Sequence, residues 1–161
     1  MKGVFLKPNP MTKPIDTILF DLGVVMLHLQ YERAIARAVP LCDPEKIARG
    51  ANFLSLLDRT HHVNDYETGR MTAFDFFAQF TAATGFRGSF DDFADLWRGI
   101  FAENEPMLAF GQELAARYPC YFLTNASDLH VPWVFERYHG LRFLRGYHCS
   151  CYAGVMKPEA A

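Results

Sequence analysis

The most apolar segment near the start of the chain runs from Thr17 to Met26, and only Asp21 and Gly23 interrupt it. A continuous apolar run of this kind is typical of a strand buried on both faces, as strands are in a parallel sheet. Cys120–Leu123 is a second short apolar run, and Phe143–Cys151 is a third strand candidate. We therefore predict three strands of one parallel sheet, with Asp21 where the first strand ends.

Between the first two predicted strands the apolar residues recur with a helical period. Thr72–Ala83 and Ser89–Phe101 carry phenylalanine and aliphatic residues at spacings close to 3.6 residues. Ser89 with Asp92 forms a capping-box-like start, and Asp43-Pro44 pairs an N-cap residue with proline at the first helical position. So many aromatic residues in short helices predict a compact helical subdomain with its own core.

Helices are also predicted between the strands of the second half. Pro106 opens one that reaches Tyr118, and Ser127 caps another that reaches about Tyr138, while Gly154–Pro158 is a loop. Strands that alternate with helices indicate an α/β fold with parallel strands and right-handed crossovers.

Composition, charge and cysteine spacing limit the classes of protein to which the chain can belong. The chain has 161 residues, of which 50% are hydrophobic and 21% charged, which suits one globular domain with an inserted subdomain. The formal net charge of -2 lacks the basic excess that nucleic-acid or anionic-membrane partners usually require. Four cysteines without a regular dense spacing indicate reduced thiols. With no apolar run of roughly 20 residues and no signal peptide, we expect a cytoplasmic protein without a membrane partner.

Residues 1–15 are predicted to form a disordered leader. The stretch Met1–Pro10 contains two prolines, Pro14 follows it, and the first patterned element begins only at about Asp16. Met11 is therefore a second candidate for the start of the protein.

Polar residues follow each of the three predicted strands. They are expected at the carboxyl edge of the sheet, where parallel sheets form their binding and active sites. Asp21 is the first: a carboxylate at the end of a buried strand needs a partner, backbone amides or a metal, and it can attack phosphorus. Thr124-Asn125 is the second, with a hydroxyl and an amide that can hold phosphate oxygens. Lys157-Pro158 is the third, since a lysine can neutralise carboxylate and phosphate together. The structural alternatives are a turn aspartate, an ordinary helix start and a surface lysine.

In this order the three points resemble the motifs of the haloacid dehalogenase (HAD) superfamily. That family has Asp-x-Asp after its first strand, then Ser or Thr often followed by Asn, and then Lys, commonly before Pro. The long helical stretch after Asp21 resembles the family's inserted cap, and Tyr66–Arg70 and the Trp97 helix resemble the cap of its phosphatase branch. The resemblance covers the chain from about Ile18 to its end.

The resemblance implies a Rossmann-like parallel sheet, incomplete at its C-terminal strands, with an inserted helical cap. The core would consist of residues 16–29 and 106–161, and the cap of residues 30–105. The family continues beyond its Lys-Pro motif with another strand and with acids that complete a Mg²⁺ site. Without these strands the segment at Ile18 becomes an exposed edge, which invites self-association. We expect either a truncated chain or a partner that supplies the missing strand.

The implied activity is hydrolysis of a small phosphomonoester, such as a sugar phosphate, through an aspartyl-phosphate. Asp21 is then the nucleophile, and its carboxylate with the carbonyl of Gly23 binds Mg²⁺. Thr124, Asn125 and Lys157 hold the phosphoryl group. Glu67 and Arg70 are the candidate substrate-binding residues of the cap, and the partner is a small phosphorylated metabolite.

The chain departs from this pattern at Gly23, where many family members carry a second Asp as general acid. Glycine cannot transfer a proton, and loss of such a group typically costs ~10²–10⁴-fold in rate. His28 and Glu67 are the candidate substitutes. A low-activity phosphatase is therefore the first expectation.

Three alternatives remain open at this point: a 2-haloacid dehalogenase, which uses the same Asp without Mg²⁺, a non-catalytic binding protein with the family fold, and a helical interaction module. His61-His62 could bind metal but is more typical of a surface loop.

Overall fold

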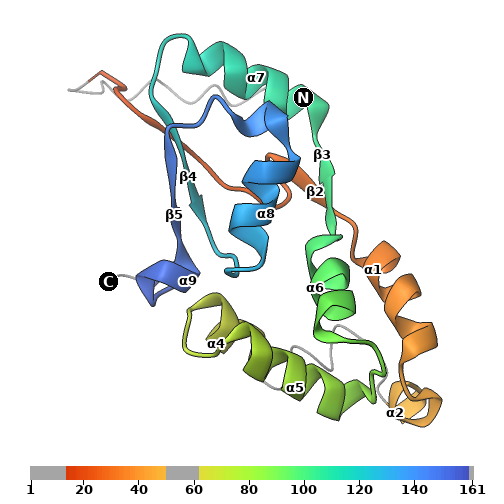
Figure 1. The fold of residues 1–161 in the computed structure, drawn as a ribbon. Coiled ribbons are helices and arrows are strands. Elements are labelled where there is room, and N and C mark those ends of the chain that lie inside the picture. The colour runs from red at the N-terminus through yellow and green to blue at the C-terminus, as the bar shows by residue number, and fades with distance from the viewer. Residues whose placement is uncertain (1–13, 50–61, 160–161) are drawn as a thin grey trace, which may run out of the picture.

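The computed structural model describes residues 14–49 and 62–159. Its centre is a three-stranded parallel sheet of β1 (Ile18–Phe20), β4 (Cys120–Thr124) and β5 (Gly146–Cys149), in the order β1-β4-β5 (Figure 1). Ile18 pairs with Cys120, and Tyr121 pairs with Gly146. The predicted α/β fold with a Rossmann-like parallel sheet is confirmed. Most of the predicted leader, including Met11, lies outside the described residues.

Two helices pack with the parallel sheet and form its core. They are α7 (Glu105–Ala115) and α8 (His130–Arg137), followed by the short 3-10 helix η2 (His139–Leu141). The buried residues of this first cluster are Phe20, Leu22, Met26, Leu27, Ile100, Phe101, Leu108, Cys120, Phe122, Val134 and Leu141. Because Leu22 and Met26 flank the turn after β1, burial of these side chains fixes the main chain on either side of it.

A second, two-stranded sheet lies where the helical insertion leaves and rejoins the chain. β2 (Leu27–Leu29) pairs antiparallel with β3 (Phe101–Glu103), with Leu29 opposite Phe101. The first strand ends directly before Asp21, as predicted, and a tight turn divides the apolar run Thr17–Met26 after that residue. Phe101 belongs to β3 and not to the preceding helix.

The inserted segment is helical, as predicted. It contains α1 (Tyr31–Ala38), the 3-10 helix η1 (Val39–Leu41), α2 (Pro44–Arg49), α4 (His62–Glu67), α5 (Ala73–Thr84) and α6 (Phe90–Arg98). The hydroxyl of Thr72 accepts a hydrogen bond from Asp75 at the start of α5, and Ser89 and Asp92 form the predicted capping box of α6. These local bonds satisfy free amides at the two helix starts.

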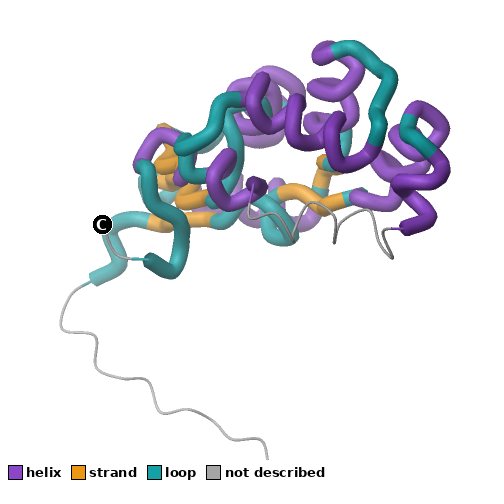
Figure 2. Tube along the Cα trace, turned by 90° about the horizontal axis from the view of Figure 1, so that it is seen from below, coloured by secondary structure: helices purple, strands orange, loops and turns teal. Residues whose placement is uncertain are grey.

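The helices have their own aromatic core. Its buried residues are Ala38, Cys42, Tyr66, Phe76, Phe80, Phe86, Phe93 and Leu96. The rings of Tyr66 and Phe76 stack with centroids 4.7 Å apart, and Trp97 meets Phe76 edge-on at 4.9 Å. Figure 2 shows the strands of the parallel sheet gathered at one end and these helices extending away from it.

Two boundaries in the second half differ from the prediction. α8 begins at His130 and not at Ser127, because the Ser127 hydroxyl accepts a hydrogen bond from the Trp97 indole at 3.2 Å instead of capping the helix. The third strand is confined to β5, and the residues after it form the short helix α9 (Ser150–Ala153). Both differences arise from contacts between segments far apart in the sequence.

Among the described residues β1 pairs with β4 alone, so it forms an edge of the sheet. Leu19 on this strand is 60% exposed and Ile15 just before it is 52% exposed. An apolar edge strand is a template for pairing with another chain, and self-association through β1 stays a prediction. None of the helices in the described ranges has both the length and the apolar character that crossing a membrane requires.

Candidate active site

The turn after β1 presents Asp21 at the carboxyl end of the sheet. The Leu22 amide donates a 2.7 Å hydrogen bond to Asp21 Oδ1, and the Leu22 carbonyl accepts from Met26 and Leu27. Leu22 is buried while the Asp21 side chain is 45% exposed. The buried apolar anchor and the two backbone bonds therefore fix the carboxylate at the surface of the sheet's edge, where a substrate can reach it.

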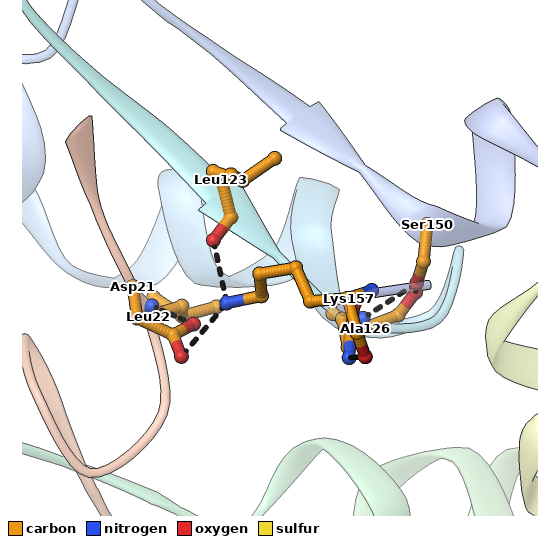
Figure 3. Close-up of polar contacts among 7 residues, drawn as sticks. Asp21, Leu22, Leu123, Ala126, Ser150 and Lys157 are labelled. Carbon is orange, nitrogen blue, oxygen red and sulfur yellow. Dashed lines mark hydrogen bonds and ion pairs between the residues drawn. The ribbon is translucent and has the colours of Figure 1, made fainter. Parts of the chain in front are cut away.

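Lys157 joins this carboxylate from the far end of the chain. Its Nζ lies 2.9 Å from Asp21 Oδ2 and donates a 2.9 Å hydrogen bond to the carbonyl of Leu123 in β4 (Figure 3). The ammonium group is thus held between the ends of β1 and β4. A cation in this position can face a carboxylate and a phosphoryl group at once.

The loop that carries Lys157 is tied to the end of β4 by an amide side chain. The Lys157 amide donates to Asn125 Oδ1 at 2.8 Å, and Asn125 Nδ2 donates to the Lys157 carbonyl at 3.1 Å. Thr124, the last residue of β4, is only 3% exposed and pairs with Cys149 of β5. Asp21, Thr124, Asn125 and Lys157 are therefore brought to the same edge of the sheet.

The end of α4 reaches the same edge from the helical insertion. Ser150 Oγ accepts a 3.1 Å hydrogen bond from the Ala126 amide and donates to the main-chain carbonyl of Glu67. Tyr66 donates a 2.6 Å hydrogen bond to Asp128, in the loop after β4. Figure 1 shows α4 next to α9, beyond the ends of β4 and β5.

Gly69 makes the close approach of this segment possible. It has a φ of 71°, and a Cβ at this position would lie 2.2 Å from the carbonyl oxygen of Cys151. Only glycine combines this backbone conformation with so short a distance to the neighbouring main chain.

The Glu67 side chain has an altered acidity. Burial, and secondarily the charge of Cys149, raise the pKa of the Glu67 carboxyl group to about 7. The charge of Glu67 in turn contributes to the raised pKa of Tyr31, after burial of that phenol. The carboxyl group therefore lies within electrostatic reach of both the start of α1 and the end of β5.

We expect Glu67→Gln to stabilise the protein at alkaline pH. Because the pKa is raised in the folded state, the folded protein keeps a proton that the unfolded chain releases between about pH 4.5 and 7, so stability falls as pH rises through this window. Above it the variant should gain on the order of 2 kcal/mol in free energy of unfolding, a value reduced for partial solvent contact. Urea unfolding at pH 4.5 and pH 8 measures the difference, which should vanish at the lower pH. A variant less stable than the parent at pH 8 would contradict the raised pKa.

Three other predictions concern Arg70, His28 and the pair His61-His62. Arg70 forms a surface ion pair with Asp65 at 3.0 Å, and its side chain is 56% exposed. His28 is exposed on β2. His61 lies outside the described residues, whereas His62 is the first residue of α4 and is only partly exposed, so the predicted surface loop is wrong at His62. The contacts of the described chain thus connect Glu67 with the sheet edge and connect Arg70 with Asp65 of α4.

A pair of thiols also lies at this edge. Cys149 Sγ and Cys151 Sγ are 3.1 Å apart, and the Cys149 thiol also donates to the Ala126 carbonyl. The hydrogen bond from Cys151 lowers the pKa of Cys149 to about 7 and raises that of Cys151. All four cysteines are free thiols, as predicted.

The sequence did not indicate the contacts that join the insertion to the sheet. Ser150, Tyr66 and Asp128 are polar residues in segments without a recognisable motif, and their pairing depends on how the helices pack. The one available signal was Gly69, since a glycine after a helical segment often marks a close approach or a left-handed turn.

The turn after β1 offers two oxygen donors for a divalent cation. These are the half-exposed carboxylate of Asp21 and the Gly23 carbonyl, to which no backbone amide in the described ranges donates. The described chain holds no group of three His, Cys, Asp or Glu side chains suited to a metal. Since Mg²⁺ commonly uses one or two protein ligands and completes its shell with water and substrate phosphate, this small donor set fits it.

Comparison with known proteins identifies the fold. A HAD family enzyme from Bacteroides thetaiotaomicron, solved in complex with magnesium and inorganic phosphate, matches with a TM-score of 0.69 and 22% identity over 91% of this chain and 74% of that chain. A predicted HAD-like family hydrolase from Porphyromonas gingivalis matches with a TM-score of 0.66 and 21% identity over 90% of this chain and 71% of that one. No protein-family model and no curated protein matches the sequence. The chain therefore has the fold of the HAD-like hydrolases.

Proposed function

Starting from this fold, we propose that the chain is a phosphatase that hydrolyses a small phosphomonoester, such as a sugar phosphate, with Asp21 as nucleophile. The observation that carries the proposal is the 2.9 Å contact between Asp21 Oδ2 and Lys157 Nζ at the carboxyl end of the sheet. A turn aspartate has no need of a lysine from a distant loop. A nucleophile that must approach a dianion does, because the cation offsets the repulsion between them.

In the proposed reaction an Asp21 carboxylate oxygen attacks phosphorus and the bond from phosphorus to the ester oxygen breaks. The leaving alcohol takes up one proton. Water then attacks the phosphorus of the aspartyl-phosphate, loses a proton, and releases inorganic phosphate with the free carboxylate. Lys157, Thr124 and Asn125 hold the phosphoryl oxygens through both steps, which is mainly a matter of position and charge.

We assign Mg²⁺ as the cofactor, held by the Asp21 carboxylate and the Gly23 carbonyl. When bound it supplies positive charge to the phosphoryl oxygens. The neighbour of the same fold that was solved with magnesium and inorganic phosphate supports this assignment.

We further propose that residues 30–105 form a cap over a core of residues 16–29 and 106–161. The separate aromatic cluster and the contacts of Glu67 and Tyr66 with the sheet edge support this division. Substrate-binding roles follow for Glu67 at the edge and for Arg70 on the flank of the cap.

The proposal is tested by hydrolysis of p-nitrophenyl phosphate and a panel of sugar phosphates by the full chain. We expect turnover that needs Mg²⁺, falls to background with EDTA and returns when Mg²⁺ is added in excess. Because the described residues provide two oxygen donors at the turn after β1, saturation should require high Mg²⁺. A parallel assay for halide release from 2-haloacids, in the presence of EDTA, tests the dehalogenase alternative. Halide release without phosphate release would overturn the phosphatase assignment.

A further inference from the structure

When the bond between phosphorus and the ester oxygen of an alkyl phosphate breaks, the leaving oxygen needs a proton donor. The described residues in contact with Asp21 do not include one. Gly23 has no side chain, and the Asp21 carboxylate and the Lys157 ammonium are paired with each other. Without a donor, the alcohol must leave as an alkoxide, which is a strongly basic and therefore poor leaving group. The site as built from the sheet alone is suited to esters with weakly basic leaving groups only.

Glu67 is an ionisable group that the insertion brings to this edge. Its main chain is fixed by the Ser150 hydroxyl, which is itself bonded to the Ala126 amide just after Thr124 and Asn125. Tyr66 next to it is bonded to Asp128 at 2.6 Å, and Gly69 packs directly against the Cys151 carbonyl. Contacts on both sides thus hold Glu67 in place across the ends of β4 and β5.

These contacts involve the main chain of Glu67 and its neighbours, and they leave its carboxyl group free to react. Within the described ranges no side chain forms a hydrogen bond or an ion pair with its oxygens, although the residue is partly buried. Partial burial without a partner makes the charged form of a carboxyl group costly, and such groups occur at functional sites more often than elsewhere.

We propose that Glu67 is the acid–base residue of this site and takes the role that Gly23 cannot perform. This inference rests on the proposed phosphatase function. In the first step the Glu67 carboxyl proton passes to the ester oxygen as its bond to phosphorus breaks. In the second step the carboxylate takes a proton from the water that attacks the aspartyl-phosphate, which restores the starting state. The substrates that benefit are alkyl phosphates, a class that includes sugar phosphates.

The groups that face Glu67 from neighbouring elements allow this cycle near neutral pH. Tyr31 of α1 and Cys149 of β5 interact with its charge, Asp128 is bonded to the adjacent Tyr66, and Cys151 is bonded to Cys149. None of the five is a cation at neutral pH, so none of them stabilises the ionised carboxylate. A carboxyl group whose pKa lies near the working pH can donate and accept a proton in turn.

The test compares Glu67→Gln with the parent chain on substrates whose leaving groups differ in basicity. Glu113→Gln, an exposed glutamate of α7, is the matched control. We expect kcat/KM of Glu67→Gln to fall ~10²–10⁴-fold for an alkyl phosphate and less than about tenfold for p-nitrophenyl phosphate, whose leaving group is a weak base. The dependence of log kcat/KM on leaving-group pKa should therefore steepen in this variant alone.

The pH profile gives a second readout. The parent should show an ionisation near neutrality in kcat/KM for the alkyl phosphate, and Glu67→Gln should lose it. Cys149→Ser should keep it, which separates Glu67 from the neighbouring thiol. A uniform loss for all substrates, an unchanged profile in Glu67→Gln, or disappearance of the ionisation in Cys149→Ser would each overturn the assignment of Glu67.

Failure of this inference can be told from failure of the proposed function. A parent chain that hydrolyses both esters, with Glu67→Gln equal to it on the alkyl phosphate, refutes the role of Glu67 and leaves the phosphatase intact. A parent chain that hydrolyses neither ester refutes both.

Discussion

Asp21→Asn is expected to remove phosphatase activity, with kcat on p-nitrophenyl phosphate reduced about 10⁴-fold or more. The amide keeps the shape of the side chain and can still accept the hydrogen bond from the Leu22 amide. It lacks the negative oxygen that attacks phosphorus, so no aspartyl-phosphate can form. The loss therefore reports chemistry and not a change in the fold.

Asp16→Asn is the matched control for this variant. Asp16 lies just before β1 and is exposed, at the end of the strand opposite Asp21. Full activity in Asp16→Asn with loss in Asp21→Asn assigns the effect to the carboxyl end of the sheet. Comparable activity of Asp21→Asn and the parent would contradict the role of Asp21.

Lys157→Met is expected to lower kcat/KM by ~10²–10³-fold, the usual cost of losing one group that stabilises developing charge. The methionine side chain preserves the length and removes the cation that faces both Asp21 and the phosphoryl group. Because the pair is partly exposed, with the lysine side chain 34% accessible, its loss should change the free energy of unfolding by less than about 1 kcal/mol. Steady-state kinetics and thermal unfolding of the same sample separate the two effects.

Lys46→Met provides the comparison, because Lys46 also donates a hydrogen bond to a carbonyl, that of Ala82, but from α2. It should retain the parent's activity. Equal losses of activity in Lys157→Met and Lys46→Met, or a large drop in stability of Lys157→Met with unchanged kcat/KM per folded molecule, would refute the role of Lys157.

Local signals in the sequence predicted the elements that local interactions determine. The capping box of Ser89 and Asp92 joins residues three positions apart, so a pattern search finds it. The strand at Cys120–Thr124 is an apolar run long enough to be distinguished from its surroundings. The ordered motifs at Asp21, Thr124-Asn125 and Lys157 then indicated the HAD-like fold.

Elements that depend on distant partners were missed or misplaced. β2 and β3 have three residues each and exist because they pair across the whole helical insertion. Ser127 has the residue type of an N-cap, yet its hydroxyl accepts from Trp97 of α6. The division of the Thr17–Met26 run follows from the turn after Asp21, whose bonds from Met26 and Leu27 to Leu22 no periodicity reveals.

In the candidate site, too, the features set by local signals could be predicted and those set by distant contacts could not. The residues at the strand ends could be predicted because parallel strands place their carboxyl ends at one edge. The position of Glu67 depended on Gly69 and Ser150 bringing the insertion against that edge, and Arg70, its near neighbour in sequence, is paired with Asp65 instead. Residues of the same short segment therefore differ in how directly they contact the sheet edge.

The most direct test of the account is to trap the covalent intermediate. The full chain, mixed with Mg²⁺ and a sugar phosphate or p-nitrophenyl phosphate, is quenched in acid during turnover and its peptides are weighed by mass spectrometry. We predict that the peptide containing Asp21 gains the mass of one phosphoryl group, and that Asp21→Asn does not. Phosphate release by the parent chain with no phosphoryl group on Asp21, or with one on another residue, would contradict it.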